Sequence, residues 1–179
     1  MKKVLIVSSS LRARSNSEAL ADAFARGAAE AGNEVERITL REKEIRFCRG
    51  CLACQQTGRC VIGDDAPAIV AKMHDADAIA FATPIYYYEM SGQLKTLLDR
   101  ANPLYSSDYR FRDIYMLTAA AEDGEWVPER AVAGLQGWID CFEKARIEGT
   151  VFAGGVTGPG ETAGHPSLQR AWEMGKTIG

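Results

Sequence analysis

Short apolar runs alternate along the whole chain with amphipathic stretches, and this alternation is the feature that most limits its fold. Strand-like runs lie at Lys3–Ser8, Glu34–Leu40, Ala78–Ala82, Asp113–Ala119 and Gly149–Val156. Helical spacing of apolar residues fills Glu18–Ala31, a short stretch from Ala66, Ser91–Ala101, Val127–Lys144 and Ser167–Ile178. The alternation predicts the α/β class, with a doubly wound five-stranded parallel sheet of order 2-1-3-4-5 and helices on both faces.

Size and charge narrow the class of protein further. The 179 residues fit a single domain, residues 1–179. A net charge of −3 argues against nucleic acid as a partner, and no run reaches the ~18–20 apolar residues that a membrane span needs. The first apolar run, Val4–Val7, is too short for a secretory signal. Together with five cysteines, this predicts a cytoplasmic protein in a reducing compartment.

In sheets of this kind, ligands bind beyond the carboxyl ends of the strands, which directs attention to the loops after Ser8, Ala82 and Ala119. The first loop, Ser8–Ser17, offers hydroxyls, an amide, two guanidinium groups and a helix start. This set predicts a site for a terminal phosphate, whereas the lack of a glycine fingerprint disfavours a pyrophosphate. Ser15 and Glu18 also have the spacing of a capping box, which is compatible with phosphate binding.

The second loop carries flat side chains where the third strand ends. Pro84 stiffens the turn, and Tyr86–Tyr88 provide aromatic surface beside it. A planar ring such as an isoalloxazine needs such a surface and nearby backbone amides. The alternative, which remains open, is that the tyrosines are partly buried packing residues.

These two loops resemble those of the NADPH-dependent FMN reductases. Thr83–Tyr86, followed by Ser91–Lys95 and Asp99-Arg100, is similar to the family's second flavin loop, and its phosphate loop is matched by Ser10, Arg12, Ser15, Asn16 and Ser17. The family often has Gly-Ser-Pro-Arg where this chain has Ser9–Arg12, which leaves the roles of Ser9 and Leu11 open. The resemblance implies a flavodoxin-like fold, FMN as cofactor, a nicotinamide nucleotide as electron donor and a homodimer or homotetramer.

The resemblance also implies a set of cofactor-binding residues. They are Ser8, Ser10, Arg12, Ser15, Asn16, Ser17, Thr83, Pro84, Ile85, Tyr86, Tyr87, Tyr88, Thr118, Ala119, Ala120 and Ala121. The implied activity is that of an FMN-dependent NAD(P)H oxidoreductase that passes electrons to an unidentified small-molecule or protein acceptor. No catalytic side chain is predicted, because the cofactor carries the chemistry and no nucleophile–base arrangement is visible.

Four of the five cysteines, Cys48, Cys51, Cys54 and Cys60, lie close together in the irregular stretch 41–65. Their compact spacing suits a [4Fe–4S] cluster better than zinc and resembles the iron–sulfur flavoproteins. Free or redox-active thiols are an equal alternative, with Cys51 and Cys54 as a C-x-x-C pair. Two further functions therefore stay open: an electron-transfer iron–sulfur flavoprotein and a thiol-based redox-sensing domain. Cys141, in a predicted helix, is interpreted as a small buried residue.

Overall fold

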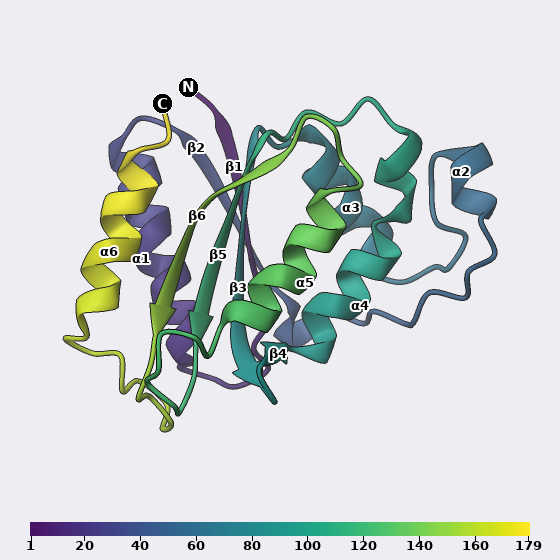
Figure 1. The fold of residues 1–179 in the computed structure, drawn as a ribbon. Coiled ribbons are helices and arrows are strands. Elements are labelled where there is room, and N and C mark those ends of the chain that lie inside the picture. The colour runs from purple at the N-terminus through teal and green to yellow at the C-terminus, as the bar shows by residue number, and fades with distance from the viewer.

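The computed structural model describes residues 1–179 and contains a parallel sheet of five long strands (Figure 1). The strands are β1 (Lys3–Ser8), β2 (Glu34–Thr39), β3 (Ala78–Tyr86), β5 (Asp113–Ala119) and β6 (Arg146–Ala153), in the order β2-β1-β3-β5-β6. A two-residue strand, β4 (Glu89–Met90), pairs antiparallel with the end of β3. The predicted order 2-1-3-4-5 is therefore confirmed, with one added hairpin.

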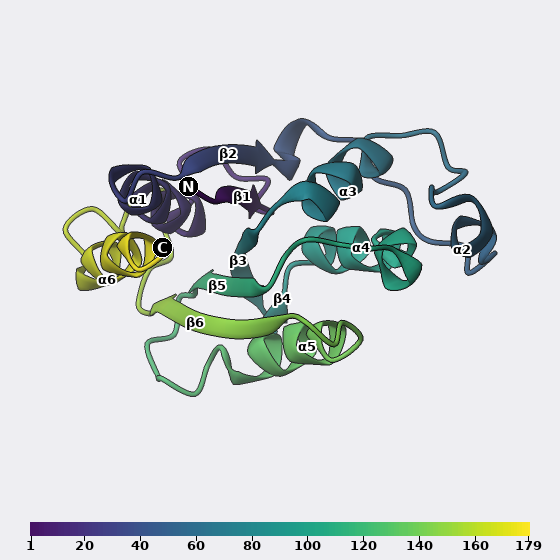
Figure 2. The same cartoon turned by 90° about the horizontal axis from the view of Figure 1, so that it is seen from above.

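Helices cover both faces of the sheet. The helices are α1 (Asn16–Glu30), α2 (Ala53–Thr57), α3 (Ala66–Asp75), α4 (Gly92–Arg100), α5 (Glu129–Ile139) and α6 (Pro166–Lys176), with 3-10 turns η1 (Leu40–Glu42) and η2 (Asn102–Ser106). Figure 2 shows α1 and α6 on one face and α3, α4 and α5 on the other. None of these helices has the length and apolar character that crossing a membrane requires.

Successive residues of each central strand enter different cores. Val4 and Ile6 of β1 belong to the core under α1 and α6, whereas Leu5 and Val7 belong to the core under α3, α4 and α5. Because both faces of these strands are buried, the strands read as continuous apolar runs, as expected in a parallel sheet covered on both sides.

Two glycines allow α1 and α6 to lie in direct backbone contact. A Cβ atom on Gly27 would lie 2.0 Å from the carbonyl oxygen of Trp172, and one on Gly175 would lie 2.2 Å from that of Phe24. Any larger side chain at these positions would push the two helices apart.

The predictions for the last third of the chain were wrong in detail. The long helix expected at Val127–Lys144 is α5, which spans only Glu129–Ile139, and the last strand begins at Arg146 rather than Gly149. β6 is an edge strand, so its first residues alternate between exposed and half-buried positions and lack a buried apolar run. Cys141 lies exposed in the turn after α5 and is not a buried packing residue.

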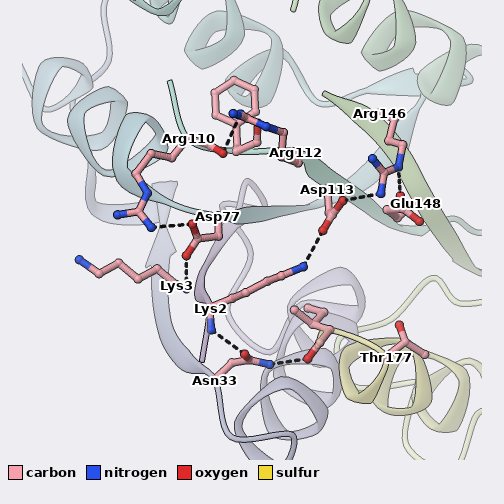
Figure 3. A network of polar contacts seen from close by, with 12 residues as sticks. Lys2, Lys3, Asn33, Asp77, Arg110, Arg112, Asp113, Arg146, Glu148 and Thr177 are labelled. Atoms are coloured by element: carbon pink, nitrogen blue, oxygen red, sulfur yellow. Dashed lines mark hydrogen bonds and ion pairs between the residues drawn. The ribbon is translucent and has the colours of Figure 1, made fainter. Parts of the chain in front are cut away.

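A polar network joins the amino-terminal ends of the strands, opposite to the edge where ligands are expected (Figure 3). Lys2 Nζ lies 3.0 Å from Asp113 Oδ2, and Asp77 accepts hydrogen bonds from the backbone N–H of Lys3 and from Arg110. These contacts tie the first residues of the chain to the loops before β3 and β5.

Candidate functional site

A cleft of about 210 Å³ opens where β1, β3, β5 and β6 end. Its lining consists of Ser10, Arg12, Ser15, Asn16, Ser17, Pro84, Ile85, Tyr86, Ala119, Ala120, Ala121, Val156 and Thr157. All but the last two are among the predicted cofactor-binding residues. The other predicted residues, Ser8, Thr83, Tyr87, Tyr88 and Thr118, lie outside this lining.

The start of α1 presents unused donors to this cleft. Ser15 caps the helix by accepting a hydrogen bond from the backbone N–H of Glu18 at 3.4 Å, and its hydroxyl lies 3.0 Å from that of Ser17. The Glu18 carboxylate pairs with Arg41, so only half of the predicted capping box forms. The backbone N–H groups of Asn16 and Ser17 have no protein acceptor. They are therefore free to bind an anion.

Arg12 and Asn16 contact a part of the chain that the sequence did not point to. Arg12 Nη1 donates to the carbonyl oxygen of Thr157 at 2.5 Å, and Asn16 Nδ2 donates to that of Gly158 at 2.9 Å. The buried Thr162 donates its backbone N–H and its hydroxyl to Asn16 Oδ1. These bonds hold residues 154–165, here termed the closing loop, against the start of α1.

Thr83 and Ser9 hold the second loop in place through buried hydrogen bonds and do not line the cleft. The Thr83 hydroxyl accepts a hydrogen bond from the backbone N–H of Ser91 at 2.9 Å. Ser91 Oγ donates to Ser9 Oγ at 2.8 Å, and Ser9 Oγ donates to the carbonyl oxygen of Ala82 at 3.1 Å. This buried chain of hydroxyls links the first loop to the second, which gives Ser9 a structural role.

The tyrosine run forms an unusual turn beside the cleft. Tyr87 and Tyr88 connect the paired residues Tyr86 and Glu89, with φ values of 50° and 66°. Tyr87 is 98% exposed. Two-residue hairpin turns with positive φ normally contain glycine or asparagine, so two tyrosines here store backbone strain.

Tyr88 is turned away from the cleft toward the third loop. Its ring packs against Trp126 with centroids 5.2 Å apart, and its hydroxyl donates to Glu122 Oε2 at 3.1 Å. The hydrogen bond to Glu122 is the first cause that raises the pKa of Tyr88. Trp126 therefore braces the tyrosine turn from outside the cleft lining.

All four clustered cysteines line a second cavity, of about 250 Å³, beside α2. Cys54 is buried, and its sulfur accepts a hydrogen bond from Asn102 Nδ2 at 3.1 Å. All five cysteines are free thiols, and no three His, Cys, Asp or Glu side chains are grouped to hold a metal ion. Figure 1 shows α2 beyond α3 and α4, away from the strand ends.

A larger cavity, of about 500 Å³, adjoins the cysteine segment and reaches α3 and η2. It includes Arg59, Cys60, His74 and Arg100 but no residue of the three strand-end loops. Because the loop donors converge at the smaller cleft, that cleft is the better candidate for the main ligand. His165 takes no part in either cavity and caps α6 by accepting from the backbone N–H of Ser167.

Comparison with known proteins places these features in context. The family profile described as NADPH-dependent FMN reductase matches residues 2–151. An iron-sulfur flavoprotein of Archaeoglobus fulgidus is 31% identical over 178 residues, which cover 99% of this chain and 79% of the relative. An iron-sulfur flavoprotein of Methanocaldococcus jannaschii is 41% identical over 102 residues, 57% of this chain and only about half (53%) of the relative.

The fold is similar to that of solved reductases. The NAD(P)H:quinone oxidoreductase from Methanothermobacter marburgensis superimposes with a TM-score of 0.76 at 19% identity, covering 99% of this chain and 96% of that one. At this identity the likeness concerns the fold alone, and it agrees with the flavodoxin-like architecture described above.

Proposed function

The chain belongs to the NADPH-dependent FMN reductase family, and from that premise we propose that it binds FMN and works as an NAD(P)H oxidoreductase. Electrons from the nicotinamide nucleotide would pass through FMN to a small-molecule or protein acceptor. One observation carries the proposal: a single cleft gathers residues from the phosphate loop, the second flavin loop and the loop after β5.

The residues present fit FMN. The unpartnered N–H groups of Asn16 and Ser17, with the nearby hydroxyls and Arg12, suit the terminal phosphate. Pro84–Tyr86 on one side and the small residues Ala119–Ala121 on another suit the flat ring.

The cofactor, when bound, would supply hydride and electron transfer. The chain's own residues would bind it, orient it and keep water from it. Among the lining residues only Arg12 and Tyr86 are ionisable, and no histidine, cysteine or carboxylate faces the cleft. That no side chain acts as catalytic acid or base stays a prediction.

A matched pair of arginine variants tests the phosphate end. Arg12 lines the cleft, whereas Arg14, two residues further along the same exposed loop, does not. We expect Arg12→Ala to weaken FMN binding about tenfold, because a charge-assisted contact to phosphate is lost, and Arg14→Ala to leave it within about twofold. Flavin fluorescence titration measures both constants. Equal affinities for the two variants would contradict the phosphate assignment.

The second candidate function adds a [4Fe–4S] cluster on Cys48, Cys51, Cys54 and Cys60. It is supported by the single cavity that all four cysteines line and by the donor that Asn102 offers to Cys54. Four thiols with this spacing are a suitable ligand set, and a bound cluster would supply one-electron transfer. The chain's part would be to hold the four sulfurs around one cavity.

Anaerobic purification followed by a UV–visible spectrum, with iron and acid-labile sulfide assays, separates the candidates. Flavin bands with stoichiometric iron and sulfide support the iron–sulfur flavoprotein, and flavin bands alone support a plain FMN reductase. A colourless protein that takes up no added FMN, but changes assembly when Cys51 and Cys54 are oxidised, would instead support the thiol-based sensor.

The proposal includes assembly and location. Tyr86, Tyr87 and Trp126 leave about half or more of their side chains exposed near the mouth of the cleft, which supports a homodimer or homotetramer that covers them. Five free thiols support a reducing, cytoplasmic location. The two hydrophobic cores lie on the two faces of one sheet, which supports a single domain over residues 1–179.

A further inference from the structure

Arg100, at the end of α4, is fully buried. It does not line the cleft proposed to bind FMN, which is termed the flavin cleft below. It forms a two-point ion pair with Asp64, whose side chain is also 0% exposed: Nη1 lies 2.6 Å from Oδ2 and Nη2 lies 2.9 Å from Oδ1. Burying a charged pair is tolerated only when its geometry is good and further hydrogen bonds are made. The remaining contacts of Arg100 therefore indicate what the pair is for.

These remaining contacts reach both ends of the cysteine-bearing loop. Nη1 donates to the carbonyl oxygen of Arg46 at 2.6 Å, two residues before Cys48. Nη2 donates to that of Ile62 at 3.3 Å, two residues after Cys60. One guanidinium group thus closes residues 47–61 into a loop with a fixed base.

Asp64 fastens the same base from the other side. Its carboxylate accepts the backbone N–H of Arg46 at 2.9 Å and that of Ala66, at the start of α3, at 3.1 Å. Burial acts to raise the pKa of Asp64, but the hydrogen bonds from Arg100 and from these two N–H groups outweigh it and hold the pKa at about 2. The aspartate is therefore ionised whenever the protein is folded near neutral pH.

One donor of Arg100 is left over. Its Nε–H is buried and has no hydrogen-bond partner. An unmade hydrogen bond of a buried donor costs about 1–3 kcal/mol, more for a charged group, so such a group calls for an acceptor. Arg100 and Cys60 line the same cavity, and the Cys60 sulfur, after Asp64, contributes to the raised pKa of Arg100.

We propose that Arg100 is a positioning residue for the cysteine site: it clamps both ends of the loop and directs its Nε–H toward the sulfur of Cys60 when that sulfur ligates a cluster. The inference rests on the proposed iron–sulfur function and deepens it. Hydrogen bonds to cluster sulfurs are among the features that set reduction potential, and removing partners of metal ligands typically costs 10–100-fold in affinity. Asn102, which donates to Cys54, would act in the same way on a second ligand.

The test compares Arg100→Lys with Arg110→Lys, a matched control at an exposed arginine that pairs with Asp77. Each protein is loaded anaerobically with ferrous iron and sulfide, and iron release to a chelator and the midpoint potential are measured. We expect Arg100→Lys to release iron about tenfold faster or more, with a more negative midpoint potential, and Arg110→Lys to match the wild type.

A second variant distinguishes the clamp, which is the pair of hydrogen bonds from Arg100 to the two loop ends, from the hydrogen bond that its Nε–H would donate to Cys60. Asp64→Asn weakens the clamp but retains the Nε–H of Arg100, so faster iron release with a midpoint potential close to the wild-type value is expected. FMN binding, measured on every variant, reports folding, because the flavin cleft contains neither residue. If Arg100→Lys does not fold, Asp64→Asn still tests the clamp, because iron release at the wild-type rate in this variant would overturn it.

The outcomes distinguish the two proposals. Wild-type protein that takes up iron while both variants release it at the wild-type rate overturns the role of Arg100 and leaves the cluster in place. Wild-type protein that takes up no iron under these conditions overturns the cluster, and the role of Arg100 with it. In both cases the FMN proposal stands or falls separately, on the flavin titration.

Discussion

At the scale of single residues, Tyr87 and Tyr88 occupy a region of backbone space that bulky side chains avoid. A positive φ brings Cβ close to the carbonyl oxygen and costs roughly 1–2 kcal/mol for residues other than glycine. Strain of this kind is retained mainly where a turn must present particular side chains. Since Tyr87 is almost fully exposed, its side chain contributes little to the fold that would offset this cost.

We therefore expect Tyr87→Gly to raise the free energy of unfolding by about 1 kcal/mol, measured by urea titration. The control is Tyr105→Gly: Tyr105 is also exposed but has no positive φ, and glycine there should lower the free energy of unfolding by roughly 0.5–1 kcal/mol. If reductase activity falls in Tyr87→Gly while stability rises, the strain serves the site. Destabilisation by both variants would show that the turn is not strained.

Asp77 makes stability depend on pH. Burial acts to raise its pKa, but hydrogen bonds from the backbone N–H of Lys3 and from Arg110 outweigh it, so the folded-state pKa lies below the ordinary value of 3.8 (Figure 3). The stabilisation is present above that ordinary value and is lost as the pH falls through the lower folded-state value.

We expect Asp77→Asn to be less stable than the wild type at neutral pH and the difference to shrink as the pH falls below 3.8 and through the lower folded-state pKa of Asp77. Urea titrations at stepped pH measure it. A difference that stays constant over this range would mean that the carboxylate's charge is not what stabilises this end of the sheet.

At the scale of elements, the contact between α1 and α6 depends on the absence of side chains. We expect Gly175→Ala to lower the free energy of unfolding by about 1–3 kcal/mol, because its Cβ would meet the backbone of α1. Gly137→Ala in α5 is the control: it has open space around it, and alanine there should be neutral or stabilising by up to about 1 kcal/mol. Thermal unfolding of both variants tests this, and similar behaviour of the two would contradict the close contact.

Elements with strong local patterns were predictable from sequence, and those set by distant contacts were not. The strand order followed from the alternation of apolar runs, and β5 was placed within its observed bounds. The hairpin of β3 and β4 was missed because Tyr87-Tyr88 carries no glycine or asparagine turn signal. At the start of α3, Asp64 accepts the Ala66 N–H and is itself held by Arg100, a contact between residues far apart in sequence that no local pattern indicates.

The residues of the candidate site also fall into two groups, those that could be predicted from the sequence and those that could not. Ser10–Ser17 and Pro84–Tyr86 could be selected because their residue types and their places after strands point to a ligand. Val156 and Thr157 could not, because they reach the cleft through bonds between the closing loop and Arg12 and Asn16, far apart in sequence. The hydrogen bonds from Arg100 to Arg46 and Ile62 could not be predicted either, because they also join residues far apart in sequence.

At the scale of the whole molecule, the flavin cleft and the cysteine cavity share no residue, and α2 lies away from the strand ends (Figure 1). FMN should stabilise the fold by about 2.7 kcal/mol at a hundredfold excess over its Kd.

In hydrogen exchange, we expect FMN to protect residues 9–17 and the closing loop, and to leave residues 47–61 unchanged. Equal protection of both regions would reveal coupling between the two sites.

The closing loop has a consequence for the order of events during biosynthesis. Val156 and Thr157 of the closing loop line the cleft, yet they emerge from the ribosome after every strand of the sheet has been made. A nascent chain therefore has the phosphate loop early and the complete cleft lining only after the closing loop has been made. We therefore expect FMN to be held firmly only once the closing loop has been made, which is later than the completion of the sheet that carries the phosphate loop.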